Sequence, residues 1–223
     1  MPYADLVHKL ALVATQVSQN PLKVTVAYKT ASPDDLDTRL LRANLIKGLV
    51  EHTTSSVVNL VNADLIADQR KLNISETKNL NTSTGGMAPL ISNVEVRISV
   101  KTNDLFPSAI CNKSGEIVVG GKVKDGEPYL TKLGQFDMDV PLDGALVLCR
   151  HRDQPGVIGA VGTTLAESDI NVNFMSVGRT GPRKDAVMAI GVDDKPTKPV
   201  VDAMAKIPAL KEVIVINLPH ALD

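Results

Sequence analysis

The residues best placed to bind a small charged ligand lie in one turn, residues 150–156 (Arg-His-Arg-Asp-Gln-Pro-Gly). Apolar spacing predicts a strand before this turn and a helix over residues 155–168 after it. The start of a helix offers unpaired backbone N–H groups and a partial positive charge. A ligand carboxylate near Pro155, Gly156 and Val157 would gain roughly 0.3–2 kcal/mol there. Asp153 lies beside this position and could accept a hydrogen bond from an ammonium group.

A second polar side chain, Asn171, opens the next expected strand at the far end of the same helix. By helix rise, the two helix ends are about 20 Å apart on one chain. One small ligand can contact both ends only if a second subunit is rotated against the first, so such a site implies a dimer. Taken singly, Asp153 is more often a helix cap and Asn171 a turn residue. His151 alone is more often exposed or satisfied by a hydrogen bond.

Catalytic and metal-binding motifs are missing from the sequence. The four histidines are scattered without HxxxH or HExxH spacing, and no GxSxG is present. Gly156, Gly159 and Gly162 have the spacing GxxGxxG rather than the GxGxxG of a dinucleotide loop. We expect these small residues to let the helix pack closely on its sheet. No catalytic residue, metal site or cofactor site is therefore predicted in this chain.

Composition excludes several classes of partner. The 24 basic and 25 acidic side chains give a net charge of −1, and aromatic residues make up 3% of the chain. Neither value favours nucleic-acid binding. No apolar run approaches the ~20 residues that cross a bilayer. The two cysteines, Cys111 and Cys149, are expected to be buried reduced thiols.

Basic residues could gather around an anion at two places, although solvated faces are the commoner role of such residues. Candidates in the first part of the chain are Arg39, Arg42 and Lys132, with Lys47, Arg70 and Lys71 as further members. Those in the last part are Arg179 and Arg183, with Lys184 beside them.

Residues 1–140 are expected to form a mixed α/β domain. Apolar spacing predicts a helix over 3–19, and Ser32-Pro33-Asp34-Asp35 has the cap, proline and acids of a second helix start. A third helix is expected over 62–71. Asp125-Gly126 is a typical hairpin dipeptide. The expected strands are residues 23–28, 73–78, 93–100, 116–123 and 130–140, with a glycine-rich loop at 82–89.

Pro141-Leu142-Asp143-Gly144 marks the expected domain boundary. The following segment predicts the order βαββαβ, which is the ferredoxin-like order, over residues 144–218. Its expected elements are strands 145–150, 171–179, 186–192 and 212–218 and helices 155–168 and 198–206. The predicted fold class is therefore α+β, with a mixed α/β domain followed by a ferredoxin-like domain.

Several stretches of the second domain resemble the ACT domain of D-3-phosphoglycerate dehydrogenases. They are residues 153–159 (Asp-Gln-Pro-Gly-Val-Ile-Gly), 170–173, 175–179 and 186–190. The first domain is similar to the same family's intervening domain over 37–41, 58–63, 120–126 and 130–132. The ACT motif is shared by many enzymes, but its combination with Asn59-Leu60-Val61-Asn62-Ala63 is far more specific. The likeness covers nearly the whole chain and is greatest to the long, plant-type form.

This resemblance implies a parent enzyme that oxidises 3-phosphoglycerate with NAD at the first step of L-serine biosynthesis, in the cytoplasm or plastid stroma. It implies that L-serine, or a similar small amino acid, binds between ACT domains of a homodimer or tetramer. His151, Asp153 and Asn171 match the serine contacts. Two positions expected to bind an anion in some members are Pro141 and Gly191 here, which puts an anion site of the intervening domain in doubt.

Two other functions fit the same residues. The chain could be a pure oligomerisation module whose effector site is vestigial. It could instead supply the regulatory domains of an L-serine dehydratase, which would need a partner subunit to provide the cysteines of an iron–sulfur cluster.

Overall fold

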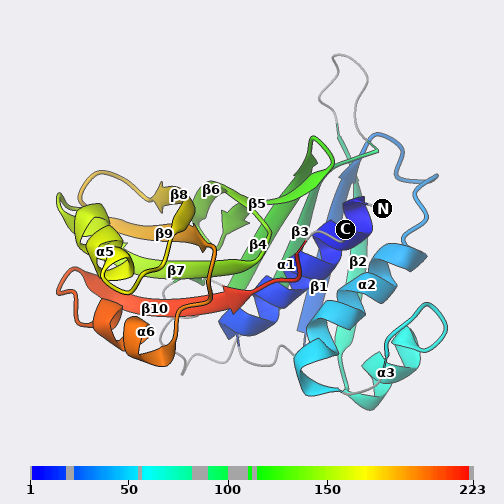
Figure 1. The fold of residues 1–223 in the computed structure, drawn as a ribbon. Helices are drawn as coiled ribbons and strands as arrows, with labels where there is room; N and C mark the ends of the chain where they lie inside the picture. Colours follow the sequence, from blue (N-terminus) through cyan, green and yellow to red (C-terminus); the bar gives the residue numbers. More distant parts are fainter. Residues whose placement is uncertain are drawn as a thin grey trace. The chain divides into compact units, whose positions relative to one another are not determined.

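The computed structural model describes residues 2–18, 23–54, 57–81, 90–99, 110–111 and 115–220. Its internal contacts divide the chain into two compact units, residues 1–134 and 135–223 (Figure 1). The division falls a few residues before the expected boundary at Pro141–Gly144. Each unit contains its own sheet and helices, and each is described separately below.

The first unit is built on helix α1 (Pro2–Ser18), which packs against helix α2 (Arg39–Val50) and strands of the sheet. The apolar stripe predicted for α1 is confirmed, since Leu6, Leu10 and Val13 are fully buried. Gly48 lies where α2 meets α1, and a Cβ there would be 2.5 Å from the carbonyl oxygen of His8. The two helices therefore approach as closely as a glycine permits. A short 3₁₀ helix η1 (Glu51–Thr53) and helix α3 (Ala63–Gln69) follow α2 in the first unit.

The strands of the first unit lie in the order β2-β1-β3-β4-β5, with β1 and β2 parallel and the other neighbours antiparallel. Asp125 and Gly126 both have positive φ angles, 50° and 89°, as the predicted two-residue hairpin turn requires. The glycine-rich stretch 82–89 lies outside the described residues. The strands are β1 (Lys23–Thr30), β2 (Asn73–Leu80), β3 (Ile91–Ser99), β4 (Glu116–Lys124) and β5 (Glu127–Leu133).

Two predictions for the first part of the chain are wrong. The second helix begins at Arg39 and not at Ser32, and the carboxylate of Asp37 accepts the backbone N–H of Arg39 at 3.0 Å, one of the donors left unpaired at a helix start. The expected single strand over 130–140 is two strands, because Gly134 adopts a left-handed conformation (φ 59°). The N–H of Gly134 donates to the carbonyl of Val118 at 2.7 Å, which ends β5 at Leu133.

The second unit has the predicted ferredoxin-like order. Its sheet runs β10-β7-β9-β8 with all neighbours antiparallel, and helices α5 and α6 share an apolar core with it (Figure 1). Strand β6 precedes this motif and contacts β8 and β9. The elements are β6 (Phe136–Pro141), β7 (Ala145–Arg152), α5 (Val157–Ala166), β8 (Val172–Arg179), β9 (Asp185–Val192), α6 (Lys198–Ala205) and β10 (Leu210–Asn217).

The glycines of α5 do not have the packing role that we expected. A Cβ added at Gly159 or Gly162 would meet nothing within 4 Å. Both glycines lie on the side of α5 away from the core, while Val157, Val161 and Leu165 are buried on the other side. Cys149 is buried in that core, and burial raises the pKa of its thiol to about 12. In the part of the chain that the structure describes, no helix is long and apolar enough to cross a membrane.

Gly48 gives a direct test of the close contact between α1 and α2. Gly48→Ala should lower the free energy of unfolding by about 1–3 kcal/mol, because the clash is with backbone and no side-chain rotation relieves it. This loss opposes the gain of up to about 1 kcal/mol that alanine normally brings to a helix. Gly48→Ser should cost more than Gly48→Ala. Urea unfolding measures both, and a stabilised Gly48→Ala variant would contradict the predicted contact.

We expect the stability of the first unit to depend on pH through the protonation of His8. Its Nε2 lies 2.6 Å from Oε2 of Glu51, and burial, partly offset by this hydrogen bond, lowers the pKa of His8 below its ordinary value of 6.5. Since the unfolded chain binds the proton more readily, the stabilising effect is complete above about pH 6.5 and is lost as the pH falls towards the folded pKa. Melting temperatures between pH 5 and 8 should show this decline. A His8→Gln variant should show less of it, and an equal decline in both proteins would refute the assignment.

Candidate functional site

The turn from β7 to α5 leaves the start of α5 open. Gly156 is the N-cap residue, has φ 88° and ψ −15°, and makes no side-chain cap hydrogen bond. The first hydrogen bond of the helix runs from Ala160 N–H to the carbonyl of Gly156 at 2.9 Å. The backbone N–H groups of the first helical turn therefore have no side-chain cap among the described residues. Pro155 and Gly156 are exposed, whereas the side chain of Val157 lies in the core.

Asp153 does not cap the helix, which would be its commonest role. Its Oδ2 accepts the backbone N–H of Arg183 at 3.0 Å and Nη1 of Arg179 at 3.4 Å, and its own N–H donates to the carbonyl of Lys184 at 2.8 Å. The N–H of Arg183 and the charge of Arg179 hold the pKa of the Asp153 carboxyl below its usual value. Asp153 is thus an ionised carboxylate fixed between α5 and the β8–β9 loop.

His151 is buried at the end of β7 and is 3% exposed. Its Nδ1 lies 2.9 Å from the carbonyl oxygen of Arg152. Because a carbonyl can only accept, Nδ1 carries the hydrogen of this bond, and a neutral ring then has a lone pair at Nε2. That Nε2 is buried with no hydrogen-bond partner among the described residues. An unsatisfied buried polar atom is rare and indicates a missing partner.

Asn171 lies at the other end of α5, beside a carboxylate that we did not predict. Its Nδ2 donates to Oδ2 of Asp193 at 2.6 Å, and Nδ2 of Asn173 donates to Oδ1 of the same carboxylate at 3.2 Å. The N–H of Asp193 returns a bond to the carbonyl of Asn171 at 3.2 Å. Two asparagines two residues apart, with an acid just after the neighbouring strand, were the sequence signal for this cluster.

The predicted side chains therefore form two groups in one chain. Asp153 and the helix start are bonded to the β8–β9 loop, and Asn171 is bonded to Asp193. The helix α5 of 10 residues separates the two groups by about 15 Å of helix rise. No hydrogen bond in the described part of the chain joins one group to the other. One small ligand therefore cannot contact both groups within a single chain.

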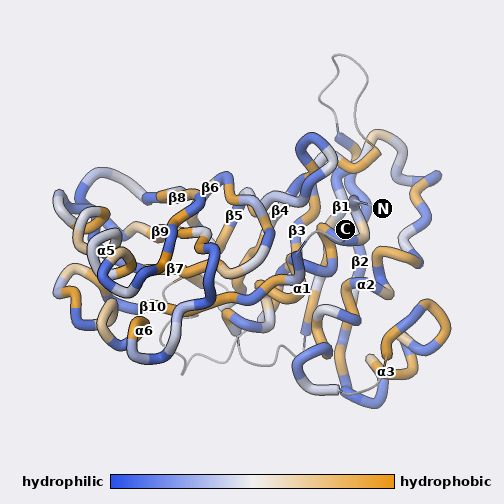
Figure 2. Tube along the Cα trace, in the orientation of Figure 1, coloured by the Kyte–Doolittle hydropathy of each residue, from blue (hydrophilic) through white to orange (hydrophobic). Residues whose placement is uncertain are grey.

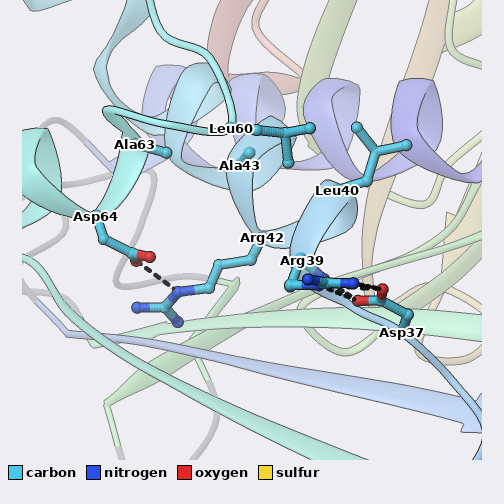
Figure 3. A pocket seen from close by; sticks show the side chains of 8 residues that line it. All are labelled: Asp37, Arg39, Leu40, Arg42, Ala43, Leu60, Ala63 and Asp64. Carbon is cyan, nitrogen blue, oxygen red and sulfur yellow. Dashed lines mark hydrogen bonds and ion pairs between the residues drawn. The ribbon is translucent and has the colours of Figure 1, made fainter.

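A pocket of about 460 Å³ in the first unit contains two of the basic candidates (Figure 3). Arg39 is bonded to both oxygens of Asp37, and these hydrogen bonds lower the pKa of the Asp37 carboxyl to about 2. Arg42 donates to Asp64 at 2.7 Å and to Glu76 at 3.0 Å. Each guanidinium thus already has a carboxylate partner. The pocket lining also contains Leu40, Ala43, Leu60 and Ala63.

The remaining basic candidates do not join this pocket. Lys132 is on β5, and three strands separate β5 from β2, where the Arg42 partner Glu76 lies. At about 4.8 Å per strand that separation approaches 20 Å. Arg179 and Arg183 belong to the second unit, where both contact Asp153. The fold therefore keeps Lys132 apart from Arg39 and Arg42, with which it was grouped.

The loop before α3 exposes apolar side chains and was not predicted as a functional element. Val57, Leu60 and Val61 are 82%, 60% and 94% exposed. The trace of the loop beside α3 is coloured mostly as hydrophobic (Figure 2). The loop is fixed by two asparagines, since Asn59 Oδ1 accepts two backbone N–H groups and Asn62 Oδ1 accepts the N–H of Asn59. A rigid loop that holds aliphatic side chains in water is typical of an interaction surface.

No cluster of three or more His, Cys, Asp or Glu side chains is found among residues that the structure describes.

Two family models match the chain. The D-3-phosphoglycerate dehydrogenase intervening domain matches residues 1–108, and the ACT domain matches residues 145–209. A probable L-serine dehydratase beta chain of Bacillus subtilis is 30% identical over 105 residues, which cover 47% of this chain and 48% of that protein. The likeness to that dehydratase is thus confined to part of the chain.

Longer matches are found to dehydrogenases. D-3-phosphoglycerate dehydrogenases 3 and 2, both chloroplastic, of Arabidopsis thaliana are 47% and 44% identical over 222 residues, 97% of this chain. A D-3-phosphoglycerate dehydrogenase of Methanocaldococcus jannaschii is 28% identical over 218 residues. The chain spans between 35% and 38% of the length of these relatives. It therefore belongs to the D-3-phosphoglycerate dehydrogenase family, in which it corresponds to the C-terminal regulatory part with an intervening domain and an ACT domain.

Proposed function

We propose that this chain is the regulatory, non-catalytic part of a D-3-phosphoglycerate dehydrogenase and binds L-serine, or a similar small amino acid, between two ACT domains. The observation that carries the proposal is the combination at the β7–α5 turn. An uncapped helix start, an ionised Asp153 and a buried Nε2 of His151 without a partner lie within six residues of sequence. This set offers one partner for each charged group of an amino acid.

The proposed contacts follow from the chemistry of these groups. The ligand carboxylate accepts backbone N–H groups near Pro155, Gly156 and Val157, where the helix dipole also favours a negative charge. The ammonium group donates to Asp153 and to the lone pair at Nε2 of His151. Each charge-assisted hydrogen bond contributes roughly 1.5–3 kcal/mol. Asn171 of a second subunit is then available for the ligand's remaining polar group.

Features around α5 support a second subunit at this place. Ile158 is 55% exposed, and Gly159 and Gly162 have nothing within 4 Å of their Cβ positions. A helix face with one exposed aliphatic side chain and two bare glycines permits close approach of another backbone. Strand β8, whose first residue follows Asn171, is the last strand in the order of its four-stranded sheet among the described residues.

We propose that the parent protein oxidises 3-phosphoglycerate with NAD at the first step of L-serine biosynthesis, and that the amino acid inhibits it by feedback. The two Arabidopsis relatives are named as chloroplastic enzymes, which favours a plastid location over the cytoplasm for this protein as well. The dehydratase alternative has weaker support. It rests on 30% identity over half of the chain, and the chain has only two cysteines.

Calorimetry on the purified chain tests the effector site. L-Serine should bind saturably, and Asp153→Ala should weaken binding at least tenfold, because the loss of one charge-assisted bond of roughly 1.5–3 kcal/mol is a factor of about ten or more. Asp202→Asn on α6 is the control, since it removes an exposed carboxylate far from the turn in sequence and should leave binding unchanged. Absence of heat at millimolar L-serine, or equal binding by Asp153→Ala, would refute the proposal.

The exposed loop of the first unit supports a second candidate function, an oligomerisation module that joins copies of this chain. In that case Val61→Ser, which leaves the Asn59–Asn62 hydrogen bonds in place, should reduce the mass measured by light scattering. Lys71→Ser is an exposed control. An unchanged mass for Val61→Ser would assign the assembly of subunits to other surfaces.

A further inference from the structure

The β8–β9 loop has a basic pocket that is separate from the uncapped helix start. It has a volume of about 440 Å³ and a lining that includes Arg152, Arg183, Lys184 and Lys211. The only carboxylate in that lining is Asp185, which forms an ion pair with Lys211. The lining therefore has four cationic side chains and one carboxylate, which gives it a net charge of +3. In a chain with a net charge of −1, such a local excess of positive charge is distinctive.

Hydrogen bonds fix the loop that contains Arg183 and Lys184, while Arg152 and Lys211 are on strands β7 and β10. Thr180 N–H donates to the carbonyl of Asp185 at 3.1 Å, and Lys184 N–H donates to the carbonyl of Gly181 at 3.2 Å. Asp153 bonds to the same loop in both directions, through the N–H of Arg183 and the carbonyl of Lys184. The cationic side chains therefore extend from a fixed backbone, which reduces the entropy lost on binding an anion.

Arg183 has a backbone conformation that is unusual for a residue with a side chain. Its φ angle is 59°, in the left-handed region that glycine adopts without steric cost. Its backbone is kept there by the hydrogen bond to Asp153. Non-glycine residues in this region are uncommon and are enriched at binding and active sites. Here the strained residue contributes a guanidinium group to the pocket.

We propose that this basic pocket binds a small phosphate-type dianion, such as inorganic phosphate or a phosphomonoester. A net charge of +3 in the lining favours a doubly charged ligand over a singly charged one, and a guanidinium fork matches phosphate oxygens. The volume lies within the range of small-molecule sites. A flat basic face for nucleic acid is not favoured, because the chain has no basic excess outside this pocket. The lining of the basic pocket contains neither Asp153 nor the residues at the start of α5. Binding of an anion in the pocket therefore does not require an amino acid at α5.

The experiment is an NMR titration of the ¹⁵N-labelled chain with inorganic phosphate at constant ionic strength and without amino acid. The amide signals of residues 180–185 should shift saturably. The double variant Arg183→Gln/Lys184→Gln should weaken binding by about tenfold or more, as expected when two charge-assisted bonds are lost. Lys195→Gln, an exposed lysine outside the pocket, should bind within twofold of the unchanged chain. Acetate at the same concentration should give no saturable shift in this loop.

Arg183→Gly separates the ligand-binding role of this side chain from a structural one. Glycine suits φ 59°, so this variant should keep its melting temperature while its affinity for phosphate falls. Retained affinity in either variant, or equal shifts with acetate and phosphate, would overturn the proposal. Binding of phosphate without binding of L-serine would refute only the proposed effector site.

Discussion

The unpaired N–H groups at the start of α5 are the feature on which the proposed site depends. Gly156 allows the chain to enter the helix in a left-handed conformation, and no described side chain caps the first turn. Asp153 would be the natural cap at this position, but it is bonded to Arg183 and Arg179. The helix start therefore keeps its hydrogen-bonding capacity, and an ionised carboxylate is fixed beside it. An amino acid could pair its carboxylate with the helix N–H groups and its ammonium group with Asp153.

The same geometry limits what one chain can do. Asn171 and its partner Asp193 lie at the opposite end of α5, so the two polar groups cannot meet around one small ligand in one chain. The bare glycines and exposed Ile158 on the outer side of α5 leave room for a neighbouring subunit. In this account, assembly of subunits and binding of the amino acid are one process. A ligand that contacts both subunits stabilises the dimer, and the dimer in turn completes the site.

Patterns within short segments predicted most of the fold. The stripe of Leu6, Leu10 and Val13, the turn at Asp125-Gly126 and the βαββαβ order depend on local spacing, which a sequence displays directly. The errors came from competition that spacing does not reveal. Ser32-Pro33 has the features of a helix start, but the helix begins at Arg39, whose backbone N–H donates to Asp37. Gly159 and Gly162 suggested close packing on the sheet, but no described atom lies within 4 Å of a Cβ placed at either glycine.

The site was predicted in part for the same reason. His151, Asp153 and Asn171 could be selected from their places at strand and helix ends. The contacts of Asp153 with Arg179 and with the β8–β9 loop could not be predicted, because strand pairing brings these residues together from distant parts of the sequence. The grouping of Lys132 with Arg39 and Arg42 failed because it ignored how many strands lie between β5 and β2. Charge type alone does not predict proximity.

Mixing two defective variants tests the shared site most directly. Asp153→Ala and Asn171→Ala would each disable both sites of a homodimer, but a mixed dimer of the two variants has one site with Asp153 from one subunit and Asn171 from the other. Calorimetry after the two proteins are unfolded and refolded together should therefore recover L-serine binding at up to about a quarter of the sites, given random pairing of subunits and the paired-subunit symmetry of such dimers. A mixture that binds no more L-serine than either variant alone would contradict a site shared between subunits.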